Sequence, residues 1–276
     1  MIEYEKGGDM IILITNDDGF ESEGIKLLKK IASNFASEVW VVAPDTDRSG
    51  SARSLDYPMK QYIKVNQHSE REFSISGTPA DCVIIALHKI MNKKPDLILS
   101  GVNFGSNVGA DVCYSGTIGA AMEGAARSIL SIALSQICNE WNEISWKNTE
   151  IFAQKVIMEL VKIGWLKNTV MSVNFPATQP VKGIEFTGQG EYDTSCNIIF
   201  TEDSDSSFSL NWHRDSISGS ESVGKVHEGF ITITPIKLDF TDYDTLKTMK
   251  DFHADKFSYL EQNLPTFNKK SIKNIL

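Results

Sequence analysis

The feature that most constrains the fold is a short apolar run that ends at two adjacent carboxylates. Residues 11–14 are all Ile or Leu, and such a run, rich in β-branched residues, is typical of a strand covered on both faces. Asp17, Asp18 and Gly19 follow, and apolar residues resume at helical spacing from Ile25. Because ligands bind at the carboxyl ends of strands in open α/β sheets, Asp17 and Asp18 are predicted to lie at a functional site.

Two neighbouring carboxylates repel each other at neutral pH unless a cation lies between them. Asp17 and Asp18 therefore suggest a site for a divalent metal ion. A solvated Asp-Asp-Gly turn that caps the next helix would explain the same residues. From this motif alone, both interpretations stay open.

The chain then alternates between apolar runs and segments of helical spacing, which is typical of βαβ units and a parallel sheet. One helix start is explicit, because Thr78 can cap it, Pro79 fits its first position and Asp81 suits the helix dipole. The predicted strands are 38–43, 62–65, 73–75, 95–100, 131–135 and 170–174, and 148–164 is predicted to be an amphipathic helix.

The character of the chain changes at Gly188, where polar stretches begin to flank short β-like pieces at 197–200 and 208–212. This pattern predicts a projecting hairpin arm. Strand character returns at 229–235, and a helix is expected at 243–260. We therefore expect a single α/β domain over residues 1–276, with a core of about 10–187 and 228–240, an arm of about 188–227, and a C-terminal helix and tail of about 241–276.

The charge and the cysteines exclude several classes of function. A net charge of −9 argues against binding to a nucleic acid polymer or to an anionic membrane, although a bound metal could still attract a small anionic substrate. The four cysteines lie far apart without a C-x-x-C pair, which suggests reduced thiols. No signal segment and no apolar stretch of membrane length is evident, so we expect a cytoplasmic protein.

Two further loops at strand ends carry oxygen donors. The Ser49 hydroxyl follows the second predicted strand, and the Asn103 side-chain carbonyl follows the strand at 95–100. Hard cations such as Mg²⁺ or Mn²⁺ prefer oxygen ligands. The loop around Asn103 lacks the G-x-G-x-x-G spacing, so the dinucleotide-binding fingerprint is absent.

A possible phosphate site follows at Ser115, Gly116 and Thr117, which open a helix of small residues. The free N–H groups and the dipole at such a helix start suit a phosphate. An ordinary N-cap accounts for the same three residues, so this motif alone is not decisive.

Several long motifs, taken together and in this order, resemble the survival protein SurE family of metal-dependent 5'/3'-nucleotidases. The resemblance covers roughly residues 11–243. The motifs that carry it are ILITNDDGFESEGIKLL, VVAPDTDRSGSARSL, GTPADCV, PDLILSGVNFGSNVGADVCYSGTIGAAMEG and EGFITITPIKLDFTDY.

The resemblance implies a Rossmann-like three-layer sandwich with a mostly parallel sheet, and a C-terminal β-hairpin arm and helix through which members form homodimers or homotetramers. It also implies one divalent metal ion per subunit, Mg²⁺ or Mn²⁺. The activity implied is hydrolysis of nucleoside 5'- and 3'-monophosphates, and in some members of short polyphosphate, by metal-activated water. Carried over position by position, the implied metal ligands are Asp17, Asp18, Ser49 and Asn103, with Asp17 and Asp18 catalytic, and the implied phosphate-binding residues are Asn107, Ser115, Gly116 and Thr117.

The chain departs from the family pattern after Ser49. Arg53 replaces a small polar residue, and Asp56 stands where Thr is common. Both lie at the predicted lip of the site.

Three alternative functions share features with this sequence. A receiver-like Mg²⁺-binding signalling module would need its phosphoacceptor Asp where this chain has Ser100. A phosphatase with an aspartyl-phosphate intermediate would need D-x-D after the first strand, and the sequence has Asn16-Asp17-Asp18 instead. A non-catalytic nucleotide-binding protein is the third hypothesis.

Overall fold

The computed structural model describes residues 9–56, 62–139, 143–190, 196–204, 207–214 and 221–253. The chain divides into two units, one that ends at Leu238 and one that begins at Asp239, and each is described by itself. No helix among the described residues is long and apolar enough to cross a membrane.

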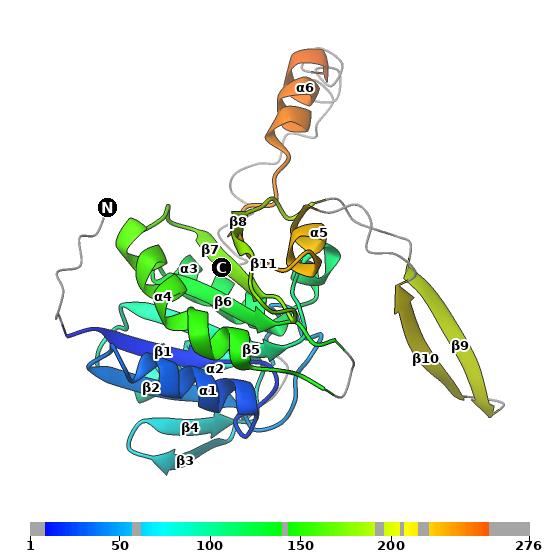
Figure 1. The fold of residues 1–276 in the computed structure, drawn as a ribbon. Coiled ribbons are helices and arrows are strands. Elements are labelled where there is room, and N and C mark those ends of the chain that lie inside the picture. Colours follow the sequence, from blue (N-terminus) through cyan, green and yellow to red (C-terminus); the bar gives the residue numbers. More distant parts are fainter. Residues whose placement is uncertain are drawn as a thin grey trace, which may run out of the picture. The chain divides into compact units, whose positions relative to one another are not determined.

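The first unit contains a nine-stranded sheet in the order β3-β4-β2-β1-β5-β6-β7-β11-β8 (Figure 1). The strands from β4 to β7 are parallel, whereas β3 and β11 run antiparallel to β4 and β7. Strands β9 and β10 pair with each other in a second, two-stranded sheet. The strands are β1 (Ile11–Thr15), β2 (Glu38–Pro44), β3 (Val65–Ser69), β4 (Glu72–Ile75), β5 (Leu97–Phe104), β6 (Leu130–Gln136), β7 (Thr169–Phe175), β8 (Gly183–Phe186), β9 (Cys196–Ser204), β10 (Ser207–Arg214) and β11 (Phe230–Lys237).

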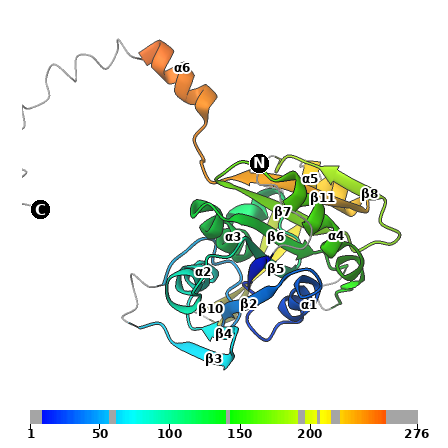
Figure 2. The same ribbon diagram turned by 90° about the vertical axis from the view of Figure 1, so that its left-hand side faces the viewer.

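Helices cover both faces of this sheet. Figure 2 shows it between α1 and α4 on one side and α2 and α3 on the other. The helical segments of the first unit are α1 (Glu23–Ala32), α2 (Pro79–Ile85), η1 (Ala86–Ile90), η2 (Gly109–Cys113), α3 (Gly116–Ala126), α4 (Lys147–Ile163) and α5 (Glu221–His227). The expected α/β three-layer sandwich is confirmed.

The first strand shows why both faces need cover. Ile12 and Ile14 pack into the hydrophobic cluster beneath α1 and α4, whereas Ile11 and Leu13 pack into the cluster beneath α2. Side chains alternate between the two faces of a strand, so an unbroken apolar run is buried on both sides. The interpretation of residues 11–14 as a buried parallel strand is confirmed.

The start of α2 also follows its sequence. Thr78 accepts a hydrogen bond from Asp81 N at 3.1 Å, and Asp81 Oδ2 accepts one from Thr78 N at 3.0 Å, which together form a capping box. Pro79 occupies the first helical position as predicted.

Two predicted strand boundaries were wrong. Strand β3 begins at Val65, where the predicted strand 62–65 ends, and all five of its residues are exposed. This edge strand is polar, so it carries no alternating apolar signal. Strand β5 continues to Phe104, past the predicted end at Ser100, because the pairing with β6 shifts between Ser100 and Asn103 and then resumes.

Glycine makes the continuation of β5 possible. Gly101 has φ +131°, and a Cβ on it would lie 2.2 Å from the Leu134 carbonyl oxygen of β6. Only a residue without a side chain allows the two strands to approach this closely. As a result, Asn103 lies on the carboxyl end of a strand and not within a free loop.

The C-terminal part differs in detail from expectation. Helix α5 lies within the range predicted as an arm and buries Val226 in a cluster with Val108 and Ile137. In the second unit, α6 (Tyr243–His253) begins where a helix was predicted. The rest of that prediction, residues 254–260 and the tail, lies outside the described residues.

Candidate metal and phosphate site

The candidate site lies where the strand order of the sheet reverses. The chain moves from β1 to β2 on one side and continues through β5 and β6 on the other. Open α/β sheets bind ligands in the crevice outside the carboxyl ends of the two strands at such a point. Asp17 and Asp18 follow β1, and Asn103 lies at the end of β5.

The loop after β1 has its shape fixed by one amide. Asn16 Nδ2 donates to the Gly19 carbonyl and to Ser22 Oγ, each at 2.8 Å. Gly19 has φ +97°, in the region that favours glycine, and a Cβ there would lie 3.2 Å from the Thr46 carbonyl carbon. This turn brings the loops after β1 and β2 into contact.

Two backbone hydrogen bonds hold these loops together. Arg48 N donates to the Asp17 carbonyl, and Phe20 N donates to the Pro44 carbonyl, each at 2.8 Å. Ser49 is therefore the residue after Arg48, whose backbone is hydrogen-bonded to Asp17.

Thr117 joins the loop after β1 to the start of α3. Its hydroxyl donates a short hydrogen bond to Asp17 Oδ1 and lies 3.3 Å from Asn103 Oδ1. Asp17 is 3% exposed and Thr117 is fully buried. Two predicted metal ligands and one predicted phosphate ligand thus meet within one buried cluster.

Burial and repulsion act together on the two carboxyls. Burial raises the pKa of Asp17, although hydrogen bonds from the hydroxyl and N–H of Thr117 oppose the rise. Burial and the charge of Asp17 raise the pKa of Asp18 to about 7, against a hydrogen bond of 3.0 Å from Phe104 N. A group that binds these carboxylates as anions must therefore compensate for desolvation and for mutual repulsion.

The loop after β2 contributes a third acidic residue that the sequence reasoning missed. The bond from Arg48 N to the Asp17 carbonyl places the loop of Asp47 beside the pair. The charge of Asp47 adds to the burial that raises the pKa of Asp17 and of Asp18. Asp47 Oδ1 also accepts hydrogen bonds from Ser49 N at 2.7 Å and Ser49 Oγ at 2.6 Å. In the sequence, Asp47 could have been identified as a further carboxylate in a loop at a strand's carboxyl end.

The start of α3 packs tightly against this site. Ser115 is its N-cap and accepts a hydrogen bond from Ile118 N at 3.0 Å, as an ordinary cap does. A Cβ on Gly116 would lie 2.9 Å from Asp17 Oδ2 and 2.8 Å from Ser51 Oγ. Ser51 Oγ, which the sequence reasoning also missed, is buried and has no hydrogen-bond partner within the described part of the chain.

Asn107 has a different environment from the other predicted residues. Its Nδ2 donates to Ser135 Oγ at 2.8 Å, and its backbone N donates to Asn174 Oδ1 at 2.8 Å. These buried bonds anchor the loop that follows β5. The role of Asn107 as a phosphate ligand stays a prediction.

The donor set fits a hard divalent cation better than a soft one. Its members are two carboxylates, a hydroxyl and a side-chain carbonyl, and oxygen is the ligand atom that Mg²⁺ and Mn²⁺ prefer. In the described ranges, no group of three or more His, Cys, Asp or Glu side chains is arranged to hold a metal ion. Neutral oxygens such as those of Ser49 and Asn103, together with water, would therefore complete the coordination.

The raised pKa of Asp18 predicts how the metal-free protein responds to pH. The native state keeps this proton up to about pH 7, whereas the unfolded chain releases it near the ordinary value of 3.8. Between these values the unfolded state binds fewer protons, so the contribution of Asp18 to stability falls as pH rises. Thermal unfolding of EDTA-treated protein from pH 4.5 to 7.5 measures this contribution.

The comparison with Asp18→Asn isolates this group from all other carboxyls. We expect the unfolding temperature of the variant to rise relative to that of the unmodified chain as pH rises from 4.5 to 7.5. A constant difference between the two proteins at every pH would contradict the assignment.

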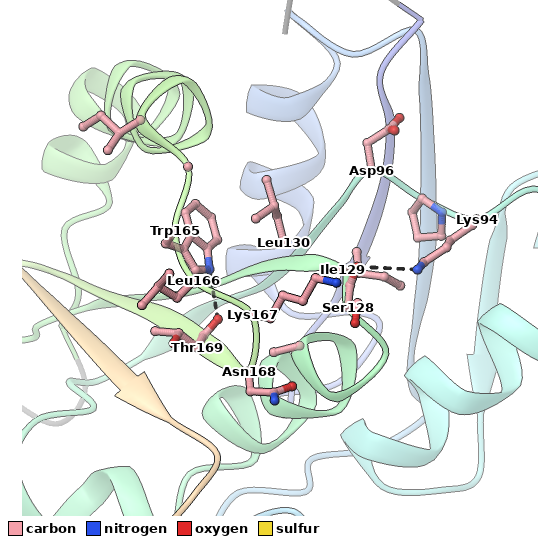
Figure 3. A pocket seen from close by; sticks show the side chains of 14 residues that line it. Lys94, Asp96, Ser128, Ile129, Leu130, Trp165, Leu166, Lys167, Asn168 and Thr169 are labelled. Atoms are coloured by element: carbon pink, nitrogen blue, oxygen red, sulfur yellow. Dashed lines mark hydrogen bonds between the residues drawn. The ribbon is translucent and has the colours of Figure 1, made fainter. Parts of the chain in front are cut away.

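A pocket of about 740 Å³ lies at the amino ends of the strands, opposite the end that carries the candidate site (Figure 3). It surrounds the amino ends of β5, β6 and β7, near Asp96, Leu130 and Thr169. Its polar groups serve the fold, since Trp165 Nε1 donates to the Thr169 carbonyl at 2.9 Å and Lys94 Nζ to the Arg127 carbonyl at 2.9 Å. This pocket is separate from the candidate site.

Comparison with known proteins identifies the family of the chain. The model of the family described as "Survival protein SurE" matches residues 12–195 of the chain. The chain belongs to the survival protein SurE family. The matched range contains all of the candidate site, from Asp17 to Thr117.

Survival protein SurE relatives cover most of the chain. A protein named "5'-nucleotidase SurE" from Wolbachia sp. subsp. Drosophila simulans (strain wRi) is 73% identical over 249 residues, which are 90% of this chain and 98% of the relative. One of the same name from Ehrlichia ruminantium (strain Gardel) is 46% identical over 252 residues, covering 87% of this chain and 98% of the relative.

A solved survival protein SurE structure has the same fold. The crystal structure of the SurE protein from Aquifex aeolicus superposes with a TM-score of 0.76 at 31% sequence identity, covering 88% of this chain and 99% of that one. Family membership does not favour the receiver-like module or the non-catalytic nucleotide-binding protein.

Proposed function

We propose that the chain is a metal-dependent nucleotidase that hydrolyses nucleoside monophosphates to nucleoside and phosphate. The observation that carries the proposal is the hydrogen bond between Thr117 and Asp17, because it joins a candidate metal ligand to the candidate phosphate-binding helix start. Relatives named 5'-nucleotidase SurE, at up to 73% identity, support the activity.

The proposed metal ligands are Asp17, Asp18, Ser49 and Asn103. The burial and repulsion that raise the pKa of both aspartates support this assignment, because a bound dication would stabilise their ionised forms. The family is metal-dependent, and we propose one Mg²⁺ or Mn²⁺ ion per subunit.

When bound, the ion would lower the pKa of a water molecule and neutralise charge on the phosphoryl oxygens. We assign phosphate binding to the backbone N–H groups at the start of α3 and to Ser115, Gly116, Thr117 and Asn107. Between the two aspartates, Asp18 is the better placed to accept the proton of the attacking water. It lies half-buried at the rim, whereas Asp17 is buried and bonded to Thr117.

We also propose that the chain acts on both 5'- and 3'-monophosphates and on short polyphosphate. A site that binds the phosphoryl group through a helix start and a cation does not require one particular ribose hydroxyl as the leaving group. Preference for a nucleoside over a smaller alcohol is then set by the lip of the site.

The assembly is a separate proposal. We propose homodimers or homotetramers that form through the arm of about 188–227 and the C-terminal helix and tail of about 241–276. Strands β9 and β10 pair with each other and not with the larger sheet, and an isolated two-stranded hairpin is marginally stable in water. A cytoplasmic location is consistent with Cys82, Cys113 and Cys138, which are free thiols.

The experiment that tests the function is phosphate release from AMP and GMP with added Mn²⁺. We expect turnover that falls below about 1% after treatment with EDTA and returns when Mn²⁺ or Mg²⁺ is restored. Glycerol phosphate is the matched control substrate, because it offers the same phosphoester without a nucleoside. Turnover that survives EDTA, or a rate on glycerol phosphate equal to that on AMP, would contradict the proposal.

A further inference from the structure

Arg53, one of the two departures from the family pattern, forms an ion pair that links the loop after β2 to α3. We propose that this ion pair makes Arg53 a positioning residue, which holds Ser49 in place and thereby sets the affinity of the site for its metal ion. The inference rests on the proposed function, since it assumes that Ser49 is a metal ligand.

The ion pair joins a buried carboxylate to a partly exposed guanidinium. Arg53 Nε and Nη2 lie 2.8 Å and 2.7 Å from Glu123 Oε2. The Glu123 side chain is 7% exposed and that of Arg53 is 38% exposed. Arg127 is the other charged partner of this carboxylate, so Arg53 is the cation that links it to the loop.

The backbone of the loop is fitted to the same helix face. A Cβ on Gly119 would lie 2.2 Å from the Ala52 carbonyl oxygen and 2.9 Å from Arg53 Cα. Ala52 N donates to the Tyr114 carbonyl at 2.9 Å. The loop therefore contacts α3 through its backbone as well as through the Arg53 side chain.

Ser49 lies between two anchored points of this loop. On one side Arg48 N is bonded to the Asp17 carbonyl at 2.8 Å, and on the other Arg53 is paired with Glu123. The loop continues to α2, where Thr78 Oγ1 donates to the Ser54 carbonyl at 2.7 Å. Ser49 itself is exposed and bonded locally to Asp47, so its place relative to the aspartates depends on these anchors.

A second arginine provides a matched control. Arg127 pairs with Glu123 Oε1, but it lies four residues further along the same chain segment, at the end of α3. Removing Arg127 takes one cation from Glu123 without releasing the loop. Removing Arg53 takes one cation from the same carboxylate and also removes the side-chain anchor of the loop, leaving its backbone contacts.

The test measures Mn²⁺ binding to the full-length protein by electron paramagnetic resonance, together with thermal unfolding and the KM and kcat for AMP. We expect Arg53→Gln to raise the Mn²⁺ dissociation constant by about 10-fold or more, the range typical of residues that orient a metal ligand. Arg127→Gln should change it by less than about twofold. Arg53→Lys keeps the positive charge but not the planar guanidinium with its two donors to Glu123. Its Mn²⁺ affinity should lie between those of Arg53→Gln and the unmodified chain.

The outcomes separate positioning from stability. A higher dissociation constant in Arg53→Gln, with Arg127→Gln close to the unmodified chain, supports the proposal. Equal losses in the two arginine variants, or unchanged affinity in Arg53→Gln and Arg53→Lys, would overturn it. If the unmodified chain binds Mn²⁺ and Asp17→Asn binds it equally well, the proposed metal site is wrong instead.

Discussion

Replacing Asp17 by Asn should lower the rate of AMP hydrolysis by roughly 10³-fold, because the change removes one of the two charges that we propose hold the metal ion. Asparagine has nearly the same size and keeps an oxygen that can accept a hydrogen bond from the Thr117 hydroxyl. The geometry of the site should thus persist while its charge is lost. Phosphate release and Mn²⁺ titration of the same samples measure the two effects.

The stability of the metal-free variant distinguishes this loss from misfolding. Asp17 is buried, and burial raises its pKa, so removal of the charge should raise the unfolding temperature of the metal-free protein. Asp9→Asn, the same change at an exposed residue before β1, is the control and should leave the activity and the unfolding temperature unchanged. More than about a tenth of normal activity in Asp17→Asn would contradict its role as a ligand.

The second large effect is expected from Gly119→Ala. The added Cβ would lie 2.2 Å from the carbonyl oxygen and 2.6 Å from the carbonyl carbon of Ala52, which are backbone atoms that cannot rotate away. The loop after β2 must shift, and a displacement of about 1 Å at a reacting group costs on the order of 10²-fold in rate. Alanine favours the helix by about 1 kcal/mol over glycine, so α3 itself should remain.

Gly124→Ala is the matched control on the same helix. Its Cβ would meet side chains of the sheet, Ile98 Cδ1 at 2.4 Å and Ser131 Oγ at 2.6 Å. We expect this variant to lose stability while its rate of AMP hydrolysis and its Mn²⁺ affinity stay normal, whereas Gly119→Ala should lower both. Comparable affinity in both variants, measured with their unfolding temperatures, would show that the contact between α3 and the loop does not set the site.

The parts of the fold that could be predicted from sequence are those encoded by local pattern. An unbroken apolar run such as residues 11–14 can be stable only with cover on both faces, and a Thr-Pro-x-Asp start specifies its own cap. The placement of Asp17 at the sheet's carboxyl edge follows from the same pattern. These inferences need no knowledge of distant residues.

Other parts of the site depend on contacts that no local pattern encodes. Thr117 lies 100 positions from Asp17 and meets it only because the start of α3 lies against the loop after β1. Asn103 reaches the rim because Gly101 allows β5 to continue along β6. Family resemblance supplied the proposed ligand set, but not the local environment of each residue.

Arg53 illustrates the same limit. In the sequence it is a departure from the family pattern, with no partner in view. In the structure its partner is a buried carboxylate 70 positions away. Likewise, Asp47 joins the site through the contact between the loops after β1 and β2, and it accepts two hydrogen bonds from Ser49.

The polar edge strand β3 restricts how copies of this chain could associate through their sheets. Its five residues are all exposed, and its pairing with β4 is interrupted between Gln67 and Ser69. Irregular, hydrophilic edges of this kind resist the addition of a further strand. Of the two borders of the described nine-stranded sheet, the one formed by β8, which exposes Ile184 and Phe186, is therefore the better suited to continuation into a neighbouring molecule.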